Sequence, residues 1–133
     1  MKNKISLDYD STLSRKDVQK YAKELVDNGY EVWIVTSRCS DEYALSKGWH
    51  WVENQNQKLY EVAELVGIPR ERIEFTNHVD KIEFLKDKEF IFHLDDDVDE
   101  LIAIMESGDS CKQVNVDHFE WLESCEKILK NCK

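Results

Sequence analysis

The chain has 133 residues, and its 28 acidic and 18 basic side chains give it a formal net charge of −10. This length is typical of one domain, which we expect to span residues 1–133. The charge excludes a general nucleic-acid-binding surface, which depends on an excess of Lys and Arg. No apolar stretch approaches about 18 residues, and residues 1–4 lack the apolar segment of a signal peptide, so we expect a cytoplasmic protein with no membrane partner.

Apolar patterns divide the chain into strands that alternate with helices. The first strand ends at Leu7, and an amphipathic helix follows a possible capping box at 14–17 and stops at Asn28-Gly29. Further strands are expected over 30–36, 73–76, 90–94 and 112–116, with helices over 55–66, 81–86, after Asp97 and at the C-terminal end. In the last two helices the side chains expected to face inward are Val98, Leu101, Ile102 and Met105, then Phe119, Leu122, Cys125, Ile128 and Leu129. Residues 37–54 show the least periodicity.

Strands that alternate with helices of this length predict right-handed crossovers and a doubly wound parallel sheet of about five strands with helices on both faces. Ligands of such Rossmann-like sheets bind at the carboxyl ends of the strands. This rule brings Asp8, Asp10, Thr36, the 76–81 segment and the 95–96 pair to one edge of the sheet.

The acidic residues at that edge need an explanation. At an effective dielectric of about 20, two unit charges about 4 Å apart repel by roughly 4 kcal/mol, so gathered carboxylates need a metal, a proton or a partner. Helix capping by Asp10, Ser11, Ser14 or the 95–97 run is the alternative, and it accounts for one acid at each place. Lys81 favours a functional edge, because a cation in the first turn of a helix opposes the helix dipole.

These motifs, in this order, resemble the haloacid dehalogenase-like phosphohydrolase superfamily over almost the whole chain. The Asp-x-Asp-x-Thr motif is matched by residues 8–12, with Ser11 where many members have Gly. The second motif, an apolar strand ending in Ser or Thr, is matched by residues 33–36. The third motif is matched by Lys81, and the acidic fourth by residues 94–96.

The resemblance implies a phosphatase that depends on Mg²⁺. Asp8 would attack phosphorus, and Asp10 would act as general acid and then general base. Mg²⁺ would be held by Asp8, the Asp10 backbone carbonyl, and Asp95 or Asp96, with the choice between the last two open. The residues that would hold the phosphate of the substrate are Thr36, Ser37 and Lys81.

The resemblance also predicts a member without a large cap domain, because helix and strand patterns account for nearly all residues between Thr36 and Lys81. The 38–54 loop then becomes the best candidate for contact with the phosphorylated substrate, which is a nucleotide, a nucleic-acid end, a phosphoprotein or another ester. Arg38 would grip a phosphate, and Trp49 and Trp51 would stack on a base. The alternatives are a solvated arginine and tryptophans that cover the edge of the sheet.

Two other classes of function compete with the enzyme. A receiver-like phosphoacceptor module also uses acids, a hydroxyl and a lysine, but its lysine comes last, whereas Lys81 precedes the final acids. A non-catalytic module that binds metal and phosphate would not need the Asp10 side chain. The sequence does not determine the substrate or the oligomeric state.

Overall fold

The computed structural model describes residues 3–52 and 54–132; Glu53, within the loop expected over 38–54, lies outside them. The described residues form one parallel sheet with the strand order β3-β2-β1-β4-β5. Its strands are β1 (Lys4–Leu7), β2 (Glu31–Thr36), β3 (Ile73–Phe75), β4 (Phe90–Asp95) and β5 (Lys112–Asn115). The predicted α/β fold, a doubly wound Rossmann-like sheet, is confirmed, and the described residues include no large cap domain.

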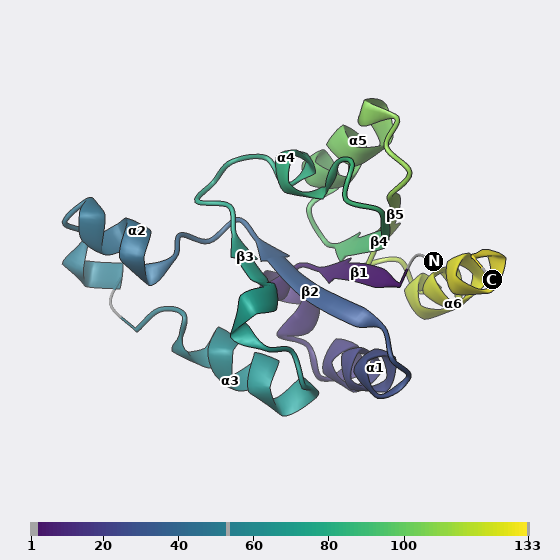
Figure 1. The fold of residues 1–133 in the computed structure, drawn as a ribbon, viewed down its shortest axis with the longest axis horizontal. Helices are drawn as coiled ribbons and strands as arrows, with labels where there is room; N and C mark the ends of the chain where they lie inside the picture. The colour runs from purple at the N-terminus through teal and green to yellow at the C-terminus, as the bar shows by residue number, and fades with distance from the viewer. Residues whose placement is uncertain (1–2, 53, 133) are drawn as a thin grey trace.

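The helices form a layer on each face of the sheet (Figure 1). They are α1 (Lys16–Asp27), α2 (Asp41–Ser46), α3 (Gln57–Val66), α4 (Ile82–Leu85), α5 (Val98–Ser107) and α6 (Trp121–Asn131). Helices α1, α3 and α6 cover one face, and the smaller pair α4 and α5 covers the other. Helix α2 belongs to neither layer and stands apart, beyond the carboxyl end of β2.

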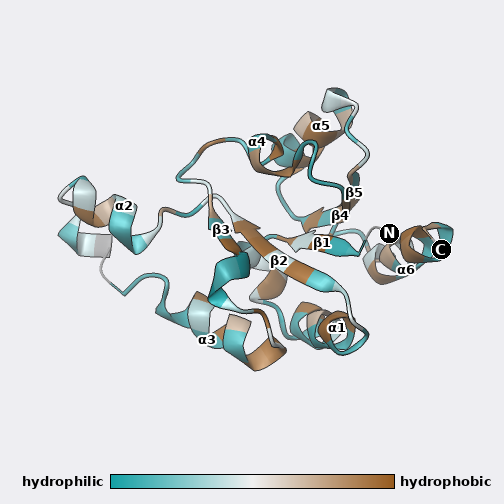
Figure 2. Cartoon of the chain, viewed as in Figure 1, coloured by the Kyte–Doolittle hydropathy of each residue, from teal (hydrophilic) through white to brown (hydrophobic). Residues whose placement is uncertain are grey.

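The hydropathy of the chain explains the layers. Figure 2 shows β2 as mostly hydrophobic, whereas α1 and α6 carry both hydrophobic and hydrophilic residues. A strand covered on both faces is apolar throughout, and a helix that covers the sheet needs only one apolar stripe. Helix α3 ends at Gly67, whose φ of 92° lies in the left-handed region that glycine adopts readily. No helix in the described ranges has the length and apolar character to span a membrane.

Helix α5 presents a different face to the sheet than its apolar pattern predicts. Leu101 and Ile104 are buried, whereas Val98, Ile102 and Met105 are exposed. The predicted inward set was therefore wrong except for Leu101. Helix α5 covers the edge of the sheet beside α4, so only a narrow stripe can be buried there. The side chain of Glu100 accepts a hydrogen bond from the Lys81 N–H and helps to fix that rotation.

Other local predictions also need correction. The capping box at 14–17 does not form: α1 begins after Arg15, and Ser14 Oγ accepts a hydrogen bond from the Ser11 N–H instead. The aperiodic 37–54 stretch contains α2, whose six residues are too few to show a helical period. In the last helix the expected inward Phe119 and Leu122 are exposed, and Phe119 precedes α6.

The order of the strands selects one place on the sheet for a ligand. From β1 the chain adds β2 and β3 on one side, and it then crosses to β4 and β5 on the other side of β1. The loops after β1 and β4 consequently diverge at the carboxyl edge. In open α/β sheets a crevice for ligands forms at such a switch point.

Candidate active site

Two acidic residues face each other at this switch point. Leu7 of β1 pairs with Leu94 of β4, so the next residues, Asp8 and Asp95, lie side by side, and the Asp8 N–H donates to the Leu94 carbonyl at 2.9 Å. Side chains alternate along a strand, so residues two apart share a face. Since Leu7 and Leu94 belong to the core under α1, α3 and α6, their neighbours Asp8 and Asp95 face the α4–α5 side.

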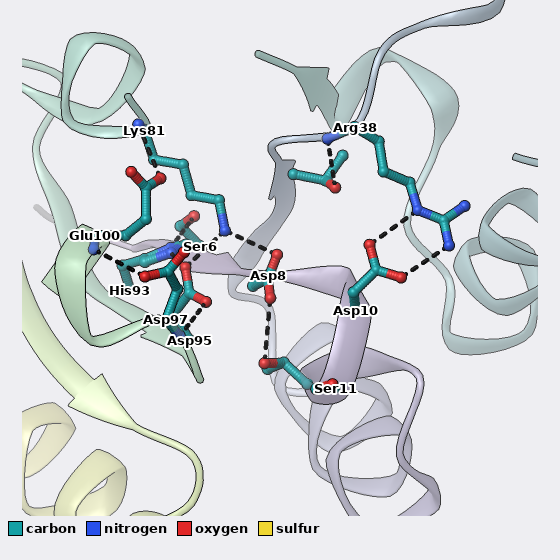
Figure 3. Close-up of polar contacts among 12 residues, drawn as sticks. Ser6, Asp8, Asp10, Ser11, Arg38, Lys81, His93, Asp95, Asp97 and Glu100 are labelled. Atoms are coloured by element: carbon teal, nitrogen blue, oxygen red, sulfur yellow. Dashed lines mark hydrogen bonds and ion pairs between the residues drawn. The ribbon is translucent and has the colours of Figure 1, made fainter. Parts of the chain in front are cut away.

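Lys81 connects these two carboxylates from the start of α4. Its Nζ donates to Asp8 Oδ1 at 2.8 Å and to Asp95 Oδ2 at 2.6 Å (Figure 3). All three side chains are buried. An ammonium group has three hydrogens, so Lys81 keeps one for another acceptor. The buried pair of acids explains why a cation opens a helix whose dipole it opposes.

A second polar chain holds Asp95 from within the sheet. His93 Nε2 lies 2.7 Å from Asp95 Oδ2, and His93 Nδ1 lies 2.7 Å from Ser6 Oγ. An ionised carboxylate only accepts, so Nε2 carries the hydrogen and Nδ1 accepts from the serine hydroxyl. Burial lowers the pKa of His93 and favours this neutral form. His93 is a fully buried histidine with a hydrogen-bond partner at each ring nitrogen, and these partners make it a support for Asp95.

Replacement of His93 by Phe is expected to destabilise the protein by roughly 1–3 kcal/mol, because Ser6 and Asp95 each lose a buried hydrogen bond. The measurement is the free energy of unfolding in urea. His50→Phe changes an exposed histidine and is the matched control, with no expected change. Equal losses in the two variants would contradict the supporting role of His93.

The hydrogen bonds of Asp95 separate its role from that of Asp96. Asp95 is fully buried; its Oδ2 accepts from Lys81 and His93, and its Oδ1 accepts from the Asp97 N–H at 3.0 Å. Asp96 is only partly buried. Because both oxygens of Asp95 already accept hydrogen bonds, Asp96 is favoured as the direct metal ligand, and Asp95 positions Lys81 through their ion pair. Asp97 is the N-cap of α5, so the capping interpretation is correct for this member of the acidic run.

The three carboxylates form a cluster that fits a divalent cation. Asp8, Asp95 and Asp96 each offer an oxygen, and these oxygens lie within 4.8 Å of one another. Such hard oxygen donors suit Mg²⁺. Lys81 supplies one positive charge against three carboxylates, so a cation would relieve the repulsion that remains. The Asp10 side chain is not part of this cluster.

The surroundings of the two central acids shift their pKa values in opposite directions. Burial, followed by the charge of Asp95, raises the pKa of Asp8 to about 8, despite the opposing effect of Lys81. Burial alone would also raise the pKa of Asp95. The hydrogen bond from His93 and the charge and hydrogen bond of Lys81 outweigh burial and hold the pKa of Asp95 below its usual range. Without a cation, the proton at this site therefore belongs on Asp8.

The second acid of the first motif lies in a wide turn that follows β1, over Tyr9–Leu13. The turn closes with hydrogen bonds from the Leu13 N–H to the Asp8 carbonyl and from the Ser14 N–H to the Tyr9 carbonyl, each spanning five residues. Wide turns of this kind are frequent at functional sites. The turn exposes Asp10 at the rim.

Asp10 and Arg38 form a two-pronged ion pair. Arg38 Nε and Nη2 donate to the two Asp10 oxygens at 2.9 and 2.8 Å, and Figure 3 shows Asp10 turned toward Arg38. Arg38 Nη1 also donates to the Gln55 carbonyl at 2.8 Å. In this structure Arg38 is therefore neither a solvated arginine nor free to grip a phosphate.

The structure places the other predicted residues at different depths. Thr36 is buried at the end of β2, where its Oγ1 accepts from the Arg38 N–H, which leaves its hydroxyl hydrogen able to donate. Ser37 is exposed next to it. Trp49 and Trp51 lie farther along the loop, next to each other, and Trp51 is 72% exposed, so it does not cover the edge of the sheet.

Sequence reasoning missed three polar partners of the site. Ser6 and His93 share the period-two face of Asp8 and Asp95, and this alternation was the signal that could have found them. Thr12 Oγ1 donates to Asp8 Oδ2 at 3.4 Å, a contact that only the wide turn creates.

No family model matches the chain, and no curated protein matches it. Among solved structures, the chain is similar to an uncharacterized protein from Corynebacterium glutamicum, with a TM-score of 0.50 and 11% sequence identity, over 98% of this chain and 96% of that chain. Likeness at this level of identity shows the α/β fold alone.

Proposed function

We propose that the protein is a Mg²⁺-dependent phosphomonoesterase of the haloacid dehalogenase-like type, with Asp8 as its nucleophile. The observation that carries this proposal is the group formed by Asp8, Asp95 and Lys81 at the switch point of the sheet, completed by Asp96 at its rim. The group combines a nucleophilic carboxylate, a buried cation and oxygen donors for a metal. Phosphoryl transfer needs these same components to stabilise negative charge.

The reaction would proceed in two displacements. A carboxylate oxygen of Asp8 attacks phosphorus, the bond to the leaving oxygen breaks, and Asp10 gives that oxygen a proton. Water then attacks the aspartyl-phosphate while Asp10 takes the proton back, and inorganic phosphate leaves. The remaining hydrogen on Lys81 Nζ and the hydroxyl of Thr36 would hold phosphate oxygens. Mg²⁺ bound by Asp8 and Asp96 would supply further charge stabilisation.

The backbone at Ser11 supports the superfamily assignment. Many members have Gly at this position of the first motif, and Ser11 has a φ of 58°. This left-handed conformation is one that glycine adopts at little cost and other residues rarely adopt. The sequence departs from the motif only in the residue type, because the conformation that favours glycine is present.

The ion pair between Asp10 and Arg38 favours a second candidate function. Both oxygens of Asp10 are occupied in this structure. A protein that only binds a metal and a phosphate needs no free acid or base at that position. The second candidate is therefore a non-catalytic module that uses the same cluster of carboxylates, and turnover separates it from the enzyme.

The deciding experiment measures phosphate release from p-nitrophenyl phosphate with Mg²⁺ and with excess EDTA. We expect turnover with Mg²⁺ and none with EDTA. Asp96→Asn is expected to raise the Mg²⁺ concentration needed for half-maximal rate by at least about tenfold, since it removes a charged ligand. Asp99→Asn, an exposed residue in the first turn of α5, is the control and leaves this concentration unchanged. Mg²⁺ binding without turnover would favour the non-catalytic module.

A further inference from the structure

An arm of residues 39–51, which contains α2, leaves the sheet directly after the loop that carries Arg38. Three aromatic rings of the arm gather with one another: the centroids of Tyr43 and Trp49 are 6.0 Å apart, and those of Trp49 and Trp51 are 6.1 Å apart. Trp51 is 72% exposed. The arm therefore presents an open aromatic surface outside the hydrophobic core.

The root of the arm lies beside the proposed general acid. Arg38, which pairs with Asp10, also donates from Nη1 to Asn56 Oδ1 at 3.3 Å. Asn56 is buried, and its Nδ2 donates to the Cys39 carbonyl at 3.0 Å and to Asp41 Oδ1 at 2.9 Å. The chain thus enters the arm and returns from it through one set of hydrogen bonds that includes Asp10.

The short connection limits the distance between Tyr43 and Arg38, the partner of Asp10. Tyr43 is five residues after Arg38, and a fully extended chain spans at most about 3.6 Å per residue, so the two residues are within about 18 Å. The Trp49 ring meets the Tyr43 ring edge-on, and the Trp51 ring lies tilted against that of Trp49. In Figure 1 the arm, with α2, projects past the carboxyl end of β2.

The aromatic surface of the arm favours a planar, uncharged group such as a base, and the net charge of the chain favours a short ligand. Exposed tryptophan rings give up the free energy of burial, and they bind bases by stacking without sequence preference. A net charge of −10 opposes a long polyanion such as a nucleic-acid strand, which needs many cations along its path. A single base on a phosphate monoester matches both features.

We infer that the arm binds the leaving group, with Trp49 and Trp51 stacking on the base of a nucleoside monophosphate whose phosphate lies at Asp8. The inference rests on the proposed function for the position of the phosphate. It names the substrate class, and it assigns specificity to a segment that is joined to Asp10 through Asn56 and Arg38.

Binding to a protein that cannot turn over tests the arm separately from catalysis. Isothermal titration calorimetry in Mg²⁺ compares adenosine 5′-monophosphate with ribose 5-phosphate, which lacks the base, on the Asp8→Asn variant. We expect the nucleotide to bind at least about tenfold more tightly. Adding Trp51→Ala is expected to remove that advantage and to leave the affinity for ribose 5-phosphate unchanged. Leu45→Ala, an exposed apolar residue of the same arm, is the control and keeps the advantage.

The outcomes separate the arm from the phosphatase. Equal affinity for the two ligands, or a preference that survives Trp51→Ala, overturns the inference even if wild-type protein hydrolyses both. A preference that depends on Trp51 in a wild-type protein without turnover supports the arm and removes the proposed catalysis. A phosphorylated trinucleotide that binds at least tenfold more tightly than the mononucleotide overturns the choice of a single nucleotide.

Discussion

Asp8→Asn is expected to lower Mg²⁺-dependent phosphate release by at least about 10³-fold, because an amide cannot form the aspartyl-phosphate and loss of a nucleophile removes the whole first displacement. The substitution keeps the shape of the side chain, and its amide oxygen can still accept from Lys81 Nζ. The measurement is the initial rate with p-nitrophenyl phosphate under saturating Mg²⁺. A rate within tenfold of the wild type would exclude Asp8 as the nucleophile.

The same variant is expected to be more stable than the wild type at pH 8 when EDTA removes the metal. The pKa of Asp8 rises from 3.8 to about 8 on folding. Between these values the folded state binds a proton that the unfolded state does not, so this group makes stability fall as the pH rises from about 4 to about 8. At about 1.4 kcal/mol per pKa unit, the loss over the whole range amounts to at most roughly 6 kcal/mol. Asparagine does not titrate in this range, so the Asp8→Asn variant does not undergo this loss of stability.

The measurement is the free energy of unfolding in urea at pH 5 and pH 8, with EDTA. We expect the advantage of Asp8→Asn to be larger at pH 8 than at pH 5. Asp27→Asn, at an exposed position at the end of α1, is the control, and no such dependence on pH is expected. A wild-type protein as stable as Asp8→Asn at both values would contradict the raised pKa.

Lys81→Met is expected to destabilise the metal-free protein by roughly 3–5 kcal/mol. The substitution leaves the buried Asp8 and Asp95 without the cation that contacts both, and removal of one partner from a buried ion pair leaves an uncompensated charge. Methionine retains most of the volume of the lysine stem, so the effect reports charge rather than a cavity. Chemical unfolding of both proteins in EDTA measures the difference.

Lys86→Met is the matched control, since Lys86 is an exposed lysine that pairs with Glu83 at the end of α4. Surface ion pairs contribute little to stability, so this variant is expected to unfold at the same urea concentration as the wild type. If Lys81→Met also unfolds at the wild-type urea concentration, the contacts of Lys81 with Asp8 and Asp95 do not stabilise the folded protein.

The fold could be predicted from the sequence because its signals are local and repeated. Apolar strands such as residues 31–36 alternate with amphipathic helices, and one rule about crossover connections then leaves few topologies. The helices were less predictable at their ends and faces. The buried stripe of α5 depends on where the helix meets the sheet edge and on the bond between Glu100 and Lys81, which periodicity does not contain.

The sequence by itself determined which residues reach the edge of the sheet: Asp8, Asp95 and Lys81 all follow from strand ends and the order of elements. Only the tertiary structure decided how they pair. The strand register sets Asp8 beside Asp95, and the buried ammonium group of Lys81 bonds to both carboxylates. The Asp95 side chain accepts from Lys81, His93 and the Asp97 N–H, whereas Asp96 lies at the rim. The pairing of Asp10 with Arg38 joins residues 28 positions apart, so no local pattern could have predicted it.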